Sequence, residues 1–257
     1  MAAQPEHAEQ ASAQDVLRAT LGNGLRVEIV RNSLAPVVAT SLNYLVGADE
    51  TPPGFPGTAH AQEHMRFRGG PGLSADRLAN IGSILGGRFN ADTRQSVTQY
   101  FYTVPADDLG IALHIEALRM HPAFPQRAFD VVRQQIKDQV SGRLQSSGYL
   151  AHRAAQHALV PAGDPTLREA LPRRIDALKL DDLRKYYQEA FRPDLTAIVV
   201  IGDVTPERAR AVIERGFGNW HATGDPPPTM LPRVPPSHAS MSAVPDTSRA
   251  QDDVTLV

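Results

Sequence analysis

The chain contains no cysteine among its 257 residues. Disulfides are therefore excluded, and any metal site would have to be built from His, Asp, Glu or weaker oxygen ligands. No apolar run approaches the roughly 20 residues that a membrane-spanning helix needs. The formal net charge of −2 at pH 7 gives no electrostatic basis for binding nucleic acid or an anionic membrane. With 42% hydrophobic and 21% charged residues, the composition is typical of a soluble globular protein.

The most informative stretch is the sequence His-Ala-Gln-Glu-His at residues 60–64. On a helix, His60 and His64 would be stacked on one face at positions i and i+4. Two neutral imidazoles in this arrangement can share a metal ion, usually Zn²⁺, and Glu63 beside them could hold and deprotonate a water molecule. This is the H-E-x-x-H protease pattern in reverse, known as the inverzincin arrangement. The alternative interpretation is a surface helix that carries two unrelated histidines.

Hydrophobic spacing and turn residues predict an α+β fold, because strands occur as a pair, a second pair and a late single strand, with helices between them. Strands are expected in the segments 21–31, 36–46, 86–105 and 195–202. Helices are expected at 59–67, 74–85, 107–119, 125–146, 149–159, 180–191 and 206–217. Thr58 is the predicted N-cap of the helix that carries the H-x-x-E-H sequence, and Thr205 caps the last helix.

Four segments are predicted along the chain. Residues 1–15 indicate a disordered tail without the apolar core of a signal peptide, and residues 16–220 form the main domain. Residues 221–238 are a proline-rich linker, and residues 239–257 have the pattern of a second, truncated domain that opens with a strand. The sequence leaves the compartment open between a cytoplasmic protein and the mature form of an exported, periplasmic one.

Three segments resemble the N-terminal domain of the pitrilysin/insulinase family of zinc peptidases. They are "GADETPPGFPGTAHAQEHMRFRGG" (47–70), "GGRFNADTRQSVTQYFYTVP" (86–105) and "DLRKYYQEAFRPDLTAIVVIGDVTPERARAVIERGFGNW" (182–220). The resemblance implies a two-layer domain whose mixed, mostly antiparallel sheet is covered by helices on one face. It also implies Zn²⁺ at His60 and His64, Glu63 as general base, and Asn90 and Ala91 as contacts of a peptide substrate. In the family, a second homologous domain or a partner subunit completes the site.

The sequence departs from this family at the third zinc ligand, which is a glutamate on a long downstream helix. The matching segment "AFDVVRQQIKDQ" (128–139) places Gln135 at the ligand position, Gln134 at its acidic neighbour and Ala128 at a supporting glutamate. An amide oxygen brings a dipole where a carboxylate brings a full charge, so Gln135 would be a weak ligand. Asp138, one turn further along the helix, could substitute for it.

Two hypotheses follow for the function. The first is a zinc-dependent metalloendopeptidase-like protein that acts on peptides or unfolded protein segments. The second is a catalytically impaired subunit or peptide-binding partner of an active family member, which Gln134, Gln135 and Ala128 favour.

Five other side chains near these motifs carry weaker expectations. Arg66 and Arg68 are either solvated charges or contacts to a partner, and the sequence favours neither. Glu116 is expected to face solvent. Tyr100 and Tyr102 alternate on a predicted strand and are expected to pack in the core or on a sheet face.

Overall fold

The computed structural model describes residues 15–226 except 53, 71 and 86. The predicted tail therefore lies outside the described residues apart from Asp15, whose carbonyl accepts a hydrogen bond from the Arg31 amide. Of the predicted linker, only residues 221–226 are described, and the predicted second domain at 239–257 lies wholly outside.

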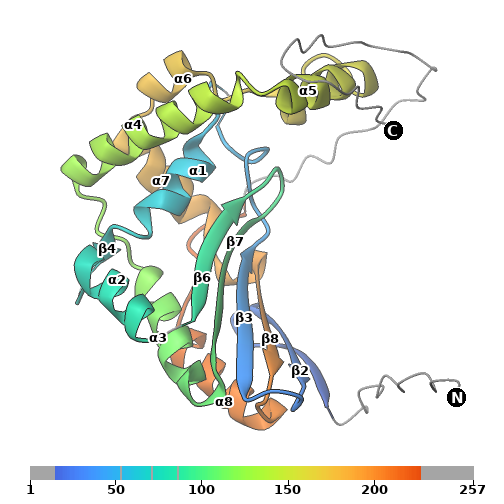
Figure 1. Ribbon diagram of the computed structural model, residues 1–257, viewed down its shortest axis with the longest axis vertical. Coiled ribbons are helices and arrows are strands. Elements are labelled where there is room, and N and C mark those ends of the chain that lie inside the picture. The colour runs from blue at the N-terminus through green and yellow to red at the C-terminus, as the bar shows by residue number, and fades with distance from the viewer. Residues whose placement is uncertain (1–14, 53, 71, 86, 227–257) are drawn as a thin grey trace, which may run out of the picture.

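A six-stranded mixed sheet forms the centre of the molecule (Figure 1). Its order is β1 (Val16–Thr20), β2 (Arg26–Arg31), β8 (Thr196–Gly202), β3 (Val37–Tyr44), β7 (Thr98–Pro105) and β6 (Arg88–Thr93). Only β2 and β8 pair in parallel, and the other neighbours are antiparallel. A two-stranded ribbon, β4 (Gly69–Gly70) with β5 (Leu73–Ser74), lies outside this sheet.

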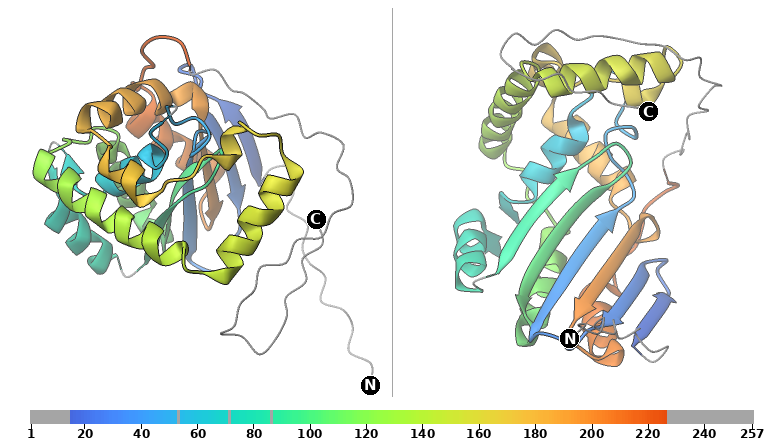
Figure 2. Two further views of the ribbon diagram at one scale, coloured as in Figure 1. Left: turned by 90° about the horizontal axis from the view of Figure 1, so that it is seen from above. Right: turned by 45° about the vertical axis from the view of Figure 1, so that its right-hand side comes forward.

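One face of the sheet carries the main hydrophobic core. Alternate residues of β3 and β8 are buried on this face, as the strand period of two requires. The helices α3 (Leu109–Arg119) and α8 (Pro206–Phe217) cover it, as Figure 2 shows. The opposite face leaves Val37 and Ile201 43% and 44% exposed. This layering confirms the predicted α+β class.

A second, smaller core lies at one end of the sheet. It joins α1 (Thr58–Met65), α4 (Gln126–Arg143), α6 (Pro172–Asp176) and α7 (Leu180–Ala190). The short helix α1 contacts the edge strand β6 as well as α4 and α7, and its Ala59 packs in the main core. It therefore lies between the sheet and the long helix α4 (Figure 1).

The remaining helices complete the chain. They are α2 (Ala75–Ile84), α5 (Ser147–Leu159) and three short 3₁₀ turns at Ala106–Asp108, Pro165–Leu167 and Pro193–Leu195. Thr205 caps α8 as predicted, accepting a hydrogen bond from the Arg208 amide. Within the described part of the chain, no helix is both long and apolar enough to cross a bilayer.

Candidate metal centre

The helix that carries the H-x-x-E-H sequence begins at a tight turn rather than at the predicted cap. Its N-cap is Gly57, with a left-handed φ of 100°. A Cβ atom at Gly57 would lie 2.5 Å from Ile175 Cδ1, so both conformation and space favour glycine there. The prediction that Thr58 is the N-cap is wrong. Thr58 is the first helical residue, and its hydroxyl donates to the Phe55 carbonyl at 2.7 Å.

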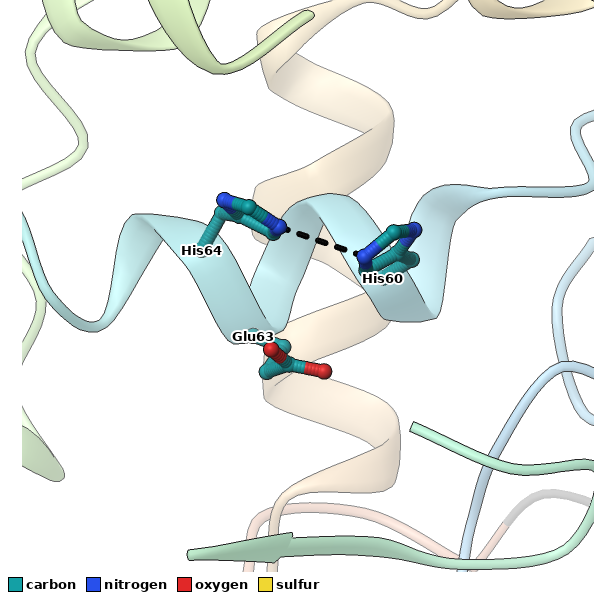
Figure 3. Close-up of side chains that lie close together, drawn as sticks. All are labelled: His60, Glu63 and His64. Atoms are coloured by element: carbon teal, nitrogen blue, oxygen red, sulfur yellow. Dashed lines mark hydrogen bonds between the residues drawn. The ribbon is translucent and has the colours of Figure 1, made fainter. Parts of the chain in front are cut away.

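The two histidines meet as the i, i+4 spacing predicts. His60 Nε2 and His64 Nε2 lie 3.2 Å apart (Figure 3). Two nitrogens bound tetrahedrally to zinc, at about 2.0–2.1 Å each, would be separated by about 3.3 Å. The same separation suits a hydrogen bond between two neutral imidazoles. The separation of the two nitrogens is therefore one that two ligands of a single metal ion can have.

Glu63 is the third member of the cluster and is buried, at 9% exposed. Potential ligand atoms of His60, Glu63 and His64 all lie within 4.8 Å of one another. The Thr93 hydroxyl on β6 donates to Glu63 Oε2 at 2.5 Å, which holds the carboxylate toward the sheet. Burial raises the pKa of Glu63; the Thr93 hydrogen bond opposes that shift and nearby Asp92 adds to it.

The histidines are held in their neutral form. Burial is the largest of the causes that lower the pKa of His60 to about 4; His64 and Arg143 act in the same direction, and Asp92 opposes them. Burial and Arg68 also lower the pKa of His64, whereas a hydrogen bond with Gln139 opposes that shift. Neutral imidazole is the form that binds a metal ion, so both side chains are ready to act as ligands near neutral pH.

The facing helix α4 brings amides and a cation to the histidines. Gln139 hydrogen-bonds His64, and Arg143 is the α4 charge that acts on His60. Gln135, the predicted third ligand, accepts a hydrogen bond from Arg68 at 2.5 Å through its side-chain oxygen. Gln135, Gln139 and Arg143 follow one face of α4 at intervals of four residues. Their partners occur in the reverse order along the chain: Arg68, His64 and His60.

Asp138 lies apart from this cluster. It accepts a hydrogen bond from Gln134 at 2.8 Å on the exposed side of α4. Among the described residues, the only group that brings three or more His, Asp or Glu ligand atoms together is His60, Glu63 and His64. The cluster therefore contains no carboxylate from α4.

The residues predicted to contact a peptide lie on β6, the edge strand that contacts helix α1. Asn90 and Ala91 belong to β6, which pairs with β7 on one side and is the last strand of the sheet. The same strand carries Thr93, which holds Glu63. An open strand edge therefore runs beside the H-x-x-E-H helix.

Comparison with protein families agrees with these features. Residues 26–158 match the family described as insulinase (peptidase family M16). Residues 177–256 match the peptidase M16 inactive domain. The chain belongs to the insulinase family.

Its curated relatives bear the names of zinc proteases and of a coenzyme PQQ synthesis protein. Coenzyme PQQ synthesis protein F of Pseudomonas aeruginosa is 28% identical over 92% of this chain and 33% of its own length. An uncharacterized zinc protease of Bacillus subtilis, YmxG, is 28% identical over 81% of this chain and 51% of its own. The insulinase-family chain thus spans between a third and about half of the length of these relatives.

Solved structures share the fold. A protease from Helicobacter pylori superposes with a TM-score of 0.79 at 23% identity, covering 86% of this chain and 54% of that one. The periplasmic protease PqqL from Escherichia coli gives 0.78 at 22% identity, covering 88% of this chain and 26% of its own.

Two charged side chains of this insulinase-family domain, Arg66 and Glu116, are buried, which the sequence did not predict. Arg66 is 1% exposed, so it is neither a solvated charge nor a surface contact. Glu116, expected to face solvent, is also 1% exposed. The two side chains form an ion pair, in which Arg66 NH2 lies 3.8 Å from Glu116 Oε2. The opposite charge of the partner makes the burial of each one tolerable. Tyr100 and Tyr102 are in the core, as predicted.

Proposed function

We propose that this chain carries the zinc-site half of a metalloendopeptidase that acts on peptides or unfolded protein segments. The observation that carries the proposal is the 3.2 Å separation of the His60 and His64 Nε2 atoms beside buried Glu63. His60 and His64 would hold Zn²⁺. Bound there, zinc would polarise the carbonyl oxygen of the scissile peptide bond.

Glu63 is suited to the role of general base. Its raised pKa brings the carboxyl closer to the neutral range, in which proton acceptance from an attacking water is most effective. Thr93 restrains the carboxylate, so the accepting oxygen has a fixed position. In this proposal Glu63 takes the proton of the water and later passes it to the leaving amine.

The edge of β6 is the proposed peptide-binding surface. An extended peptide would add to the sheet beside Asn90 and Ala91, using backbone hydrogen bonds that do not depend on its sequence. Folded proteins cannot present such a segment, so the substrate class is peptides or unfolded chain. Because the relatives are longer than this chain, we propose that a second homologous domain or a partner subunit closes over this edge.

The weak point of the proposed zinc site is its third ligand. Gln135 would offer only an amide oxygen, and that oxygen is already bonded to Arg68. Arg143 and Arg68 also bring positive charge toward the position of a dication. We therefore expect weak zinc binding and little turnover from this chain by itself.

The same contacts favour a second candidate function. A family member with Gln135, Gln134 and Ala128 at positions where the family carries carboxylates, and with Arg143 and Arg68 near the histidines, would keep the peptide-binding edge and lose catalysis. In this alternative the chain is a peptide-binding or structural partner of an active relative.

Zinc analysis separates the two candidates. Under the peptidase proposal, purified protein binds one zinc ion, and the variant Gln135→Glu binds it at least about tenfold more tightly, because a carboxylate replaces an amide. Gln134→Glu is the matched control, since it adds the same charge one residue away on the exposed face, where Gln134 bonds Asp138. Isothermal titration with ZnCl₂ gives the affinities. Absence of zinc binding in both wild type and Gln135→Glu would support the binding partner instead.

A further inference from the structure

The helix α1 presents polar side chains to the interior of the molecule. Gln62 and Arg66 lie one turn apart, so they share a face, and at 100° per residue that face is opposite the one with His60 and His64. Gln62 is 0% and Arg66 1% exposed. Arg66 is also the C-cap residue, and its amide bonds back to the Gln62 carbonyl. A charged side chain therefore fixes the inner side of the helix that carries the proposed ligands.

The Arg66 guanidinium is held on several sides. Its central carbon lies 4.3 Å from the ring centre of Tyr100 and 4.8 Å from that of Tyr44. One terminal nitrogen lies 3.8 Å from Glu116 Oε2. The rings come from β7 and β3 and the carboxylate from α3, so one side chain ties α1 to three other elements.

Glu116 is in turn held by a second buried arginine. Arg119 NH1 donates to Glu116 Oε1 at 2.7 Å and to the Tyr102 hydroxyl at 3.1 Å. The Arg119 guanidinium also lies 4.1 Å from the ring centre of Phe67, which follows Arg66 in the chain. Two buried cations share one buried anion. We name Arg66, Glu116 and Arg119 the buried charge cluster.

Such a cluster is an inefficient way to stabilise a core. Most of the buried side-chain nitrogen and oxygen atoms that lack a hydrogen-bond partner within the described part of the chain belong to it or to its neighbours Gln62, Tyr44 and Tyr100. Desolvating buried ion pairs commonly offsets their attraction, and apolar residues of similar size are often as stabilising. What contacts from several elements can add is a defined geometry, with a fixed position for the charged group, since the Tyr44 and Tyr100 rings and Glu116 surround the Arg66 guanidinium.

The helix α1 needs that geometry, because it spans only eight residues and has no side-chain N-cap. Its other buried residues include the small side chains Ala59 and Ala61, which resist rotation poorly. With side-chain tips roughly 6 Å from the helix axis, a rotation of about 20° would move an imidazole nitrogen by about 2 Å. Because His60, Glu63 and His64 lie on the same helix, a shift of that size would carry them together away from their partners on other elements, Thr93 on β6 and Gln139 on α4.

We propose that Arg66, held by Glu116 and by the rings of Tyr44 and Tyr100, is a positioning residue. It fixes the rotation of α1 and thereby the placement of the H-x-x-E-H side chains against α4 and β6. The buried charge cluster thus serves the geometry of the proposed metal centre rather than the stability of the fold. The zinc readout of this inference rests on the proposed function, whereas the arrangement of the histidines can be read without metal.

The deciding variant replaces the whole cluster by apolar residues, as Arg66→Met/Glu116→Leu/Arg119→Met. Arg66→Met alone would leave Glu116 with fewer partners and could fail to fold, whereas the triple variant leaves no buried charge unpaired. We expect its thermal unfolding midpoint to stay within about 5 °C of wild type or to rise. We expect its zinc affinity to fall at least about tenfold.

Imidazole ¹⁵N NMR of the metal-free protein is the second readout. In wild type, the ring nitrogen shifts of His64 should show one fixed tautomer, held by the hydrogen bond with Gln139 on α4. In the triple variant they should become those of a histidine that averages between tautomers. The control is Arg192→Met/Asp194→Leu, which removes a different, partly buried ion pair between an arginine and an aspartate. In that pair Arg192 Nε lies 2.6 Å from Asp194 Oδ1. It should change neither the zinc affinity nor the histidine shifts.

The outcomes are distinct. A triple variant that folds, binds zinc as wild type does and keeps the wild-type histidine shifts would overturn the positioning role. If wild type binds no zinc but the triple variant still loses the fixed tautomer of His64, the proposed function fails and the positioning role stands.

Discussion

At the scale of single residues, the proposed site depends on how burial controls charge. His60 and His64 stay neutral because the interior disfavours their cations, and burial raises the pKa of Glu63. Thr93 opposes the shift of Glu63 by donating to its ionised carboxylate. One hydroxyl therefore decides how easily the expected general base loses its proton.

Replacing Thr93 by valine keeps the shape of the side chain and removes this hydrogen bond. The pKa of Glu63 in the folded protein should rise further above its unfolded value. A raised carboxyl pKa leaves stability intact below the unfolded pKa and reduces it as pH rises through the folded pKa. Thr93→Val should therefore lower the unfolding free energy by about 2 kcal/mol at pH 8 but by less than about 1 kcal/mol at pH 4. Urea unfolding at the two pH values measures the difference.

The matched control is Thr103→Val on the exposed side of β7. It should change stability by less than about 0.5 kcal/mol at either pH. An equal loss at pH 4 and pH 8 for Thr93→Val would show that the hydrogen bond does not act on the charge of Glu63.

At the scale of elements, the geometry of the site depends on where α1 starts and how it is held. Gly57 turns the chain into the helix with a left-handed φ, directly against Ile175 of α6. At the other end, Arg66 ties the helix to the sheet and to α3. The two histidines lie between these fixed points, so a shift at either end should reach them.

Gly57→Ala tests the N-terminal end of α1. The left-handed conformation would cost about 1–2 kcal/mol for alanine, and the overlap with Ile175 about as much again, so a total loss of about 3 kcal/mol is expected. Gly54→Ala is the control, because Gly54 has a similar φ of 91° with no atom near its Cβ position. It should lose only about 1 kcal/mol. Equal losses for the two variants in urea unfolding would contradict the packing explanation.

At the scale of the whole molecule, the sheet has two edges and only one of them lies beside the candidate site. β6 borders α1, whereas β1 ends the sheet at the far side (Figure 1). Both edge strands have unpaired backbone groups that an extended peptide could use. The position of α1 is what distinguishes them.

Hydrogen exchange can show which edge binds peptide. With a saturating, protease-resistant extended peptide, amide exchange in residues 88–93 should slow at least about tenfold, because strand addition protects edge amides. Residues 16–20 of β1 provide the internal control and should exchange at an unchanged rate. Equal protection of both strands, or of neither, would argue against β6 as the peptide-binding edge.

Much of the fold and the core of the site could be predicted because the signals are local. Strand alternation, helix spacing and the i, i+4 separation of His60 and His64 each act over a few residues, and the structure reproduces them. The predicted cap at Thr58 was wrong because the turn before α1 depends on Gly57 packing against α6, which lies over a hundred residues away in the chain. Asp138 had the helical spacing of a substitute ligand, yet it bonds Gln134 instead.

The sequence by itself determined the family and most of the elements, and it placed glutamines at positions 134 and 135 of the long helix. Only the tertiary structure decided what those side chains contact and which charges are buried. Arg68 bonds Gln135, and Arg143 acts on His60, because α4 lies against α1. Arg66 and Glu116 are buried because partners from β3, β7 and α3 meet around them. Burial of a charge depends on groups far apart in the chain, and no local pattern records their meeting.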